Sequence, residues 1–155
     1  MKTINIICIE KNKDMFIVEG IKNYIAKINR FVKINIVYLK GLNKKNISEE
    51  ELKSYEFRMI ANKLEQNSYK ILLDVEEDLL DSFQFANFLN KIIQFPNKIE
   101  FIIGGVYGVS EELKKMVNKK ISLSKLTFSH QLVRLILLEQ IYRGFCIMNN
   151  VPYHK

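Results

Sequence analysis

The sequence contains few of the residue types that build common metal and redox sites. Of its 155 residues only two are cysteines, Cys8 and Cys146, and they lie far apart in the chain. Two isolated thiols do not form the paired clusters that bind zinc or iron–sulfur groups. We therefore expect no metal site, and we expect a reduced protein of the cytoplasm.

Long apolar stretches are also absent. Arg134, Glu139 and Arg143 interrupt the longest candidate for a membrane span, and a spanning helix needs about 20 predominantly apolar residues. The first residues lack the long apolar region and cleavage site of a signal peptide. Internal repeats, low-complexity tracts and linkers are not found either. We expect one globular domain over residues 1–155, long enough to bury roughly 70% of its unfolded surface.

Glycine is scarce, and its placement is informative. Only six glycines occur, and none directly follows the first apolar run, Ile4–Ile9. A Rossmann dinucleotide site needs a glycine-rich turn at that point, so the sequence disfavours one. Gly104, Gly105 and Gly108 stand together after the apolar run 100–103. Such glycines let a backbone approach a ligand closely, although a tight turn with no ligand would use them too.

Short apolar runs alternate with amphipathic stretches along the chain. The runs predict strands, and the stretches predict helices with one apolar face. The predicted strands cover 4–9, 33–39, 71–73, 100–103 and a brief segment near 121, and the predicted helices cover about 14–28, 48–66, 82–95, 110–120 and 130–148. This alternation is typical of an α/β fold, in which a parallel sheet carries helices on both faces.

The chain is basic, with a formal net charge of +7 that lies mainly toward its two ends. Ten Lys or Arg stand against five acids in residues 1–50, and eight stand against three in residues 101–155. This distribution suits a polyanion such as RNA near the glycine-rich turn. A charge that only confers solubility remains the alternative. The same two possibilities apply to the lysines Lys114, Lys115, Lys119 and Lys120.

Four segments of the C-terminal part occur in a specific order: Ile103–Gly108, Ser122–Arg134, Leu138–Arg143 and Pro152–Lys155. In combination they resemble the ribosomal RNA large-subunit methyltransferase H family, which belongs to the SPOUT class. The resemblance implies a methyltransferase that uses S-adenosylmethionine and modifies N3 of a pseudouridine in large-subunit ribosomal RNA, on the assembled ribosome. It also implies a trefoil knot near the C-terminus.

The resemblance further implies that three segments at strand ends bind the cofactor. Carried over by position, the cofactor-binding residues are Leu73, Gly104, Leu123, Ser124, Lys125, Leu126, Thr127 and Phe128. Open α/β sheets in general bind ligands at the carboxyl ends of their strands. For each leucine taken alone, a place in the core remains the alternative.

His154 and Tyr153, in the terminal motif, are the residues that we expect to handle the substrate, and we expect Arg143 to supply charge. N3 of the target base carries a proton, so a nearby base or cation would assist its loss. The other histidine, His130, begins the last predicted helix, where capping or bracing is the alternative to chemistry. For Arg134 and Glu139, a purely structural ion pair is the alternative to a functional role. The aromatic residues best placed to stack on a base are Tyr107, Tyr142 and Tyr153.

A homodimer that pairs through the last helix is also implied, with the partner completing the active site. The apolar stripe available for pairing consists of Leu135, Leu138, Ile141, Tyr142 and Phe145. Packing of this stripe inside the monomer is the alternative. A module that keeps the fold but only binds RNA or the ribosome is the alternative to an enzyme, and another RNA, such as a tRNA, is the alternative substrate.

Four positions depart from the resembled pattern. Glu10 stands where glycine is usual, Phe57 follows Glu56 where glycine is usual, and Ser129 replaces a frequent proline. The acidic pair at 77–78 replaces a Gly–Lys pair. We expect these two carboxylates in a loop beside the cofactor cleft, where they would repel RNA.

Overall fold

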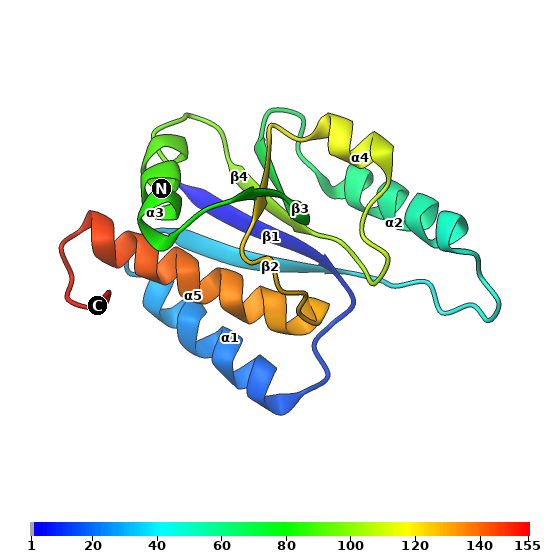
Figure 1. The fold of residues 1–155 in the computed structure, drawn as a ribbon, viewed down its shortest axis with the longest axis horizontal. Helices are drawn as coiled ribbons and strands as arrows, with labels where there is room; N and C mark the ends of the chain where they lie inside the picture. The colour runs from blue at the N-terminus through cyan, green and yellow to red at the C-terminus, as the bar shows by residue number, and fades with distance from the viewer. Residues whose placement is uncertain (1) are drawn as a thin grey trace.

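The computed structural model describes residues 2–155 and shows a five-stranded sheet whose paired strands all run parallel (Figure 1). The strand order is β2-β1-β4-β3-β5. The strands are β1 (Thr3–Ile9), β2 (Lys33–Leu39), β3 (Tyr69–Leu79), β4 (Ile99–Ile103) and β5 (Lys119–Ser122). The helices are α1 (Met15–Ile28), α2 (Glu49–Lys63), α3 (Ser82–Ile92), α4 (Glu111–Met116) and α5 (His130–Met148).

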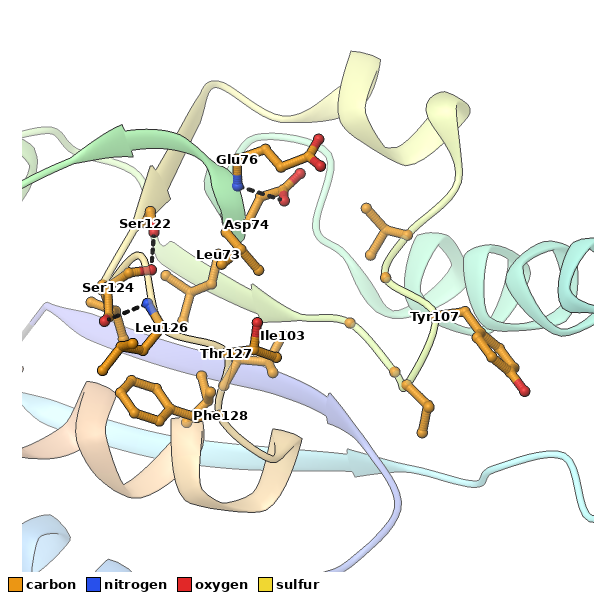
Figure 2. Close-up of a pocket in the computed structure, with 18 of the residues that line it drawn as sticks. Leu73, Asp74, Glu76, Ile103, Tyr107, Ser122, Ser124, Leu126, Thr127 and Phe128 are labelled. Atoms are coloured by element: carbon orange, nitrogen blue, oxygen red, sulfur yellow. Dashed lines mark hydrogen bonds between the residues drawn. The ribbon is translucent and has the colours of Figure 1, made fainter.

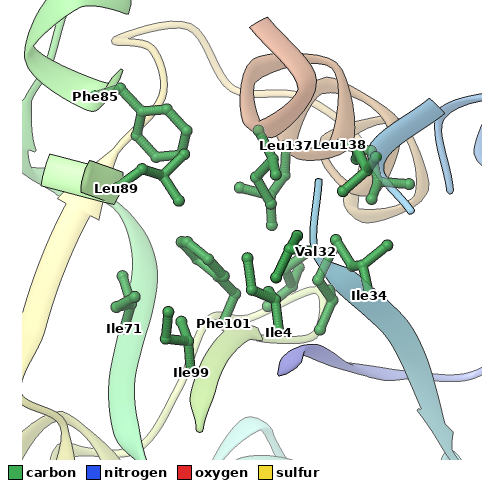
Figure 3. Packing of buried hydrophobic residues seen from close by; sticks show 14 of the residues in the cluster. Ile4, Val32, Ile34, Ile71, Phe85, Leu89, Ile99, Phe101, Leu137 and Leu138 are labelled. Atoms are coloured by element: carbon green, nitrogen blue, oxygen red, sulfur yellow. The ribbon is translucent and has the colours of Figure 1, made fainter. Parts of the chain in front are cut away.

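Helices cover both faces of the sheet, as predicted. Successive strand side chains point to opposite faces, so Ile4 and Ile6 of β1 pack with α1, α3 and α5, whereas Ile7 and Ile9 pack with α2 and α4. Figure 3 shows the larger core, in which Phe101 lies between the sheet and the helices that carry Phe85 and Leu137. Strands buried on both faces are typical of parallel sheets.

The prediction that the third strand ends before Asp74 was wrong. β3 continues to Leu79, and after a register shift its second half pairs with β5. Lys119 Nζ lies 3.0 Å from Asp78 Oδ2, and Lys120 Nζ lies 3.4 Å from Glu77 Oε1. The acids therefore extend the strand because lysines of the neighbouring strand offset their charge. The predicted helix over 110–120 is correspondingly shorter, since its last residues join the sheet.

The predicted bounds of the last helix, 130–148, are confirmed. Most of its apolar stripe, however, packs in the core of the monomer. Leu138, Ile141 and Phe145 are at most 4% exposed and belong to the larger core. Leu135 packs closely on α1, where a Cβ at Gly20 would be 2.9 Å from its Cδ1. The alternative of packing inside the monomer therefore holds for the buried three.

Arg134 is a buried brace. It is 1% exposed, and Nη1 donates to the Glu10 carbonyl at 2.9 Å and to Asn12 Oδ1 at 2.8 Å. Nη2 donates to the carbonyl of Ile9. These bonds tie the end of β1 and the loop after it to α5. Arg134 is therefore structural, but its acceptors are carbonyl and amide oxygens and not the carboxylate of the predicted ion pair.

Candidate active site

A cleft of about 700 Å³ lies at the carboxyl ends of β4 and β5 and beside the middle of β3, where β3 stops pairing with β4. All of the cofactor-binding residues predicted from the sequence line it: Leu73, Gly104, Leu123, Ser124, Lys125, Leu126, Thr127 and Phe128. Figure 2 shows Leu73, Thr127 and Phe128 around this space. Parallel strands end at one edge of a sheet, and this edge brings residues 50 positions apart in the chain into one wall.

The loop after β5 is held by its own hydroxyl groups. Ser122 Oγ donates to the Ser124 carbonyl at 2.8 Å, and the Leu126 N–H donates to Ser124 Oγ at 3.0 Å (Figure 2). Side chains of this kind commonly close short turns against the backbone. The loop therefore presents Leu126, which is 70% exposed, from a fixed backbone at the edge of the cleft.

The glycine-rich turn forms another wall. Gly108 N–H donates to the Gly105 carbonyl at 3.1 Å, and Gly108 has φ 80°, which favours glycine. A Cβ on Gly104 would lie 2.6 Å from Val109 Cγ1. The turn itself thus requires glycine at two positions. At its tip Tyr107 is 50% exposed and points away from the cleft centre (Figure 2).

Charges of both signs line the cleft. Asp74 Oδ1 accepts from the Glu76 N–H at 3.3 Å, and Asp74 Oδ2 lies 3.8 Å from Lys114 Nζ. The hydrogen bond from Lys114 to Glu111 and the nearby carboxylates raise the pKa of the lysine. The sequence directed attention to the acids at 77–78, but residues 74 and 76 face the cleft. The sequence could have indicated these two acids by their position just after Leu73, which was predicted to bind the cofactor.

The three residues predicted to be catalytic lie together, but none of them lines the cleft of the same chain. Arg143 Nη2 and Nε donate to Glu139 Oε1 at 2.5 and 3.1 Å, and Tyr153 Oη donates to the same oxygen at 3.1 Å. Arg143 Nη1 lies 3.1 Å from His154 Nδ1. The terminal segment therefore packs against the C-terminal half of α5. Glu139 forms a structural ion pair, as one alternative had it.

A buried carboxylate lies behind the glycine turn, where the sequence analysis did not place a functional group. Glu56 is 7% exposed, and a Cβ on Gly105 would be 2.5 Å from both of its carboxylate oxygens. Burial and the nearby Glu10 carboxylate raise the pKa of Glu56 to about 7. Glu10 has φ 64°, which explains why glycine suits that position better.

The remaining predicted residues have structural surroundings. Burial and the charge of Arg134 lower the pKa of His130, which begins α5 behind its N-cap, Ser129. Tyr142 and Tyr153 pack edge to face with ring centroids 4.8 Å apart. Of the three tyrosines proposed for stacking, Tyr107 is the exposed one.

The fold and the cleft define a class of protein. A family model described as "Predicted SPOUT methyltransferase" matches residues 1–154. The chain therefore belongs to the SPOUT methyltransferase family, as the four motifs indicated. Two solved structures share the fold: a probable methylase family protein from Haemophilus influenzae Rd KW20 and TrmJ from Z. mobilis ZM4, each with a TM-score of 0.52.

These structural matches are 13% and 8% identical to the chain and show the fold alone. They cover 95% and 93% of this chain, which spans 66% and 70% of theirs.

Curated relatives identify the particular group. The chain is 46% identical to ribosomal RNA large subunit methyltransferase H of Malacoplasma penetrans, over 98% of this chain and 99% of that protein. It is 41% identical to the protein of the same name from Fusobacterium nucleatum subsp. nucleatum, again over 98% and 99%. The protein of that name from Parabacteroides distasonis is 39% identical over 97% and 98%. The resemblance to the methyltransferase H group is thus confirmed over the whole chain.

Within residues 2–155, no helix has the length and apolar character needed to cross a bilayer. The same part of the chain holds no group of three or more His, Cys, Asp or Glu side chains arranged to bind a metal.

Proposed function

We propose that the chain, as one domain of residues 1–155, uses S-adenosylmethionine to methylate N3 of a pseudouridine in large-subunit ribosomal RNA. It acts on the assembled ribosome in the cytoplasm. One observation carries the proposal: three segments far apart in the sequence, at Leu73, Gly104 and 123–128, converge on one cleft at the carboxyl edge of the sheet. Family membership and the names of the curated relatives support it.

The lining of the cleft fits an adenosyl sulfonium. Its volume of about 700 Å³ lies within the range of small-molecule sites. Leu73, Ile103 and Phe128 offer apolar contact to a purine, and the backbone of 104 and 123–127 offers polar groups beside it. Asp74 and Glu76 favour a cationic ligand by their charge. Bound there, the cofactor would supply an activated methyl group, so the protein mainly has to align the base and exclude water.

We propose that two copies pair, so that the terminal segment of one reaches the cleft of the other. The separation of Arg143, Tyr153 and His154 from the cleft of their own chain supports this arrangement. Met15 and Phe16 at the start of α1 are 68% and 67% exposed, and they offer apolar surface beside α5. In this arrangement Tyr153 and His154 contact the base, and Arg143 contributes positive charge.

The finer fold proposal is a trefoil knot, with α5 passing through a loop made by the preceding segments. The meeting of the 104–108 turn, the 122–128 loop and the start of α5 at one cleft supports it.

Methyl transfer to defined RNA substrates tests the function. Ribosomes from cells that lack this gene are incubated with the protein and S-adenosylmethionine carrying a labelled methyl group. We expect label in large-subunit RNA of assembled ribosomes, and none in free RNA or tRNA. Label in tRNA would show that tRNA is a substrate and would overturn the proposal of ribosomal RNA in the assembled ribosome.

Calorimetry with S-adenosylmethionine separates an enzyme from a module that only binds the ribosome. We expect saturable binding that Leu126→Glu weakens at least tenfold. Leu79→Glu is the matched control, because Leu79 is also exposed but lies outside the cleft. Absence of binding by the unaltered protein would favour the module.

A further inference from the structure

A chain of polar contacts links α1, α5 and the terminal segment outside the cleft. Tyr24 Oη lies 3.3 Å from Tyr153 Oη, whose hydroxyl donates to Glu139 Oε1. Glu139 in turn holds Arg143 through two donors of the guanidinium, and Arg143 Nη1 reaches His154 Nδ1 at 3.1 Å. Glu139 is the member that both Tyr153 and Arg143 contact, and its other oxygen, Oε2, accepts from Gln140 Nε2 at 2.6 Å.

The contact between Arg143 and His154 defines where the histidine proton lies. A guanidinium has five N–H donors and no acceptor, so Nδ1 of His154 must accept the hydrogen bond. In a neutral imidazole that accepts at Nδ1, the proton is on Nε2. A second proton at Nδ1 would place two donors and two positive charges 3.1 Å apart.

Charged and aromatic groups surround the network. The charged groups are Glu139 and Arg143 of α5 and Lys27 of α1, whose Nζ lies 5.2 Å from the Tyr24 ring centroid. Tyr24 of α1 and Tyr153 are the other titratable groups. Phe83 of α3 packs edge to face against His154, with ring centroids 4.7 Å apart. Arg143 also lies over the Tyr153 ring, 4.7 Å from its centroid. The imidazole is thus held by a cation on one nitrogen and by an aromatic ring at its side.

We propose that Glu139 is a positioning residue that, through Arg143, orients His154 with Nδ1 as the acceptor and its proton on Nε2, so that His154 offers the target base a hydrogen-bond donor. The proposal rests on the proposed function, in which the terminal segment meets the base. A donor at this position stabilises negative charge that develops on a carbonyl oxygen of the ring as N3 loses its proton to solvent water. In this state His154 does not accept the N3 proton at Nε2.

Nitrogen NMR of the free protein tests the tautomer without RNA or cofactor. The chain has only two histidines, and a His130→Gln variant assigns the signals. We expect His154 to show a protonated Nε2 and an unprotonated Nδ1 at pH 7. Arg143→Met and Glu139→Ala should each mix the two tautomers, whereas Glu19→Gln, which alters another ion pair of a surface helix, should not. A proton on Nδ1 in the unaltered protein would overturn the proposal.

Methyl-transfer kinetics test the role of the donor. A glutamine at 154 keeps an N–H group, so His154→Gln should retain at least tenfold more kcat than His154→Ala. A kcat that falls as far in His154→Gln as in His154→Ala would refute the role of the donor. Failure of methyl transfer altogether would refute the proposed function and leave the NMR result standing.

Discussion

Replacing Glu56 by glutamine measures the effect of the carboxylate buried behind Gly105 on folding. The folded protein raises the pKa of Glu56 from 4.5 to about 7, by burial first and by the charge of Glu10 second. A raised carboxyl pKa means that the folded state prefers the protonated form. The contribution of Glu56 to stability is therefore fully present below pH 4.5 and is lost as the pH rises from 4.5 through 7.

Glutamine resembles the protonated acid and does not ionise. The full shift corresponds to about 3 kcal/mol at 1.36 kcal/mol per pKa unit. Because the side chain is still 7% exposed and its surroundings can relax, we expect a gain of about 1–2 kcal/mol at pH 8. At pH 4.5 the gain should vanish.

Urea denaturation at pH 4.5, 6 and 8 measures the free energy of unfolding of both proteins. Glu50→Gln is the matched control, because this glutamate of the same helix is exposed and its replacement should change stability equally at all three values. A Glu56→Gln variant with the same stability difference at pH 4.5 and pH 8 would refute the reasoning.

Three further substitutions test single contacts. Glu10→Gly should raise the free energy of unfolding by about 0.5–1 kcal/mol, since glycine adopts φ 64° without strain; a loss in urea denaturation would contradict this. Gly104→Ala should lower the free energy of unfolding by about 1–2 kcal/mol, because the added Cβ meets Val109. It should also weaken cofactor binding in calorimetry, and unchanged binding would mean that this turn does not contact the cofactor. Arg134→Met should cost about 3 kcal/mol by leaving carbonyls after β1 unpaired, seen as a lower Tm; an unchanged Tm would exclude the brace.

Much of the fold was predictable because burial follows short-range periodicity. β2 and α5 have the bounds that the sequence predicted, since apolar spacing marks each of them clearly. The end of β3 was not predictable in this way. Its acids look like a loop in isolation, and they become strand residues because Lys119 and Lys120 of β5 lie beside them.

The positions of the cofactor residues were predicted, through the family's motifs and through the rule that ligands bind at strand ends. That they line one cleft follows from the structure; that they bind a cofactor stays a prediction. The carboxylates of Asp74 and Glu76 were missed, because the sequence does not say which acids of a run face inward. Glu56 was missed for a related reason, since a charged helix residue is usually exposed.

The sequence by itself determined the alternation of strands and helices, the family motifs and the glycine turn, all of which depend on residues near one another in the chain. Only the tertiary structure decided that Arg134 braces the loop after β1, that Leu138 and Phe145 belong to the monomer core, and that Glu139 gathers Arg143 and Tyr153. These contacts join groups that are far apart in the chain and come together only when the helices pack on the sheet. The energy of each contact depends on how deeply its groups are buried, and a local sequence pattern does not determine that burial.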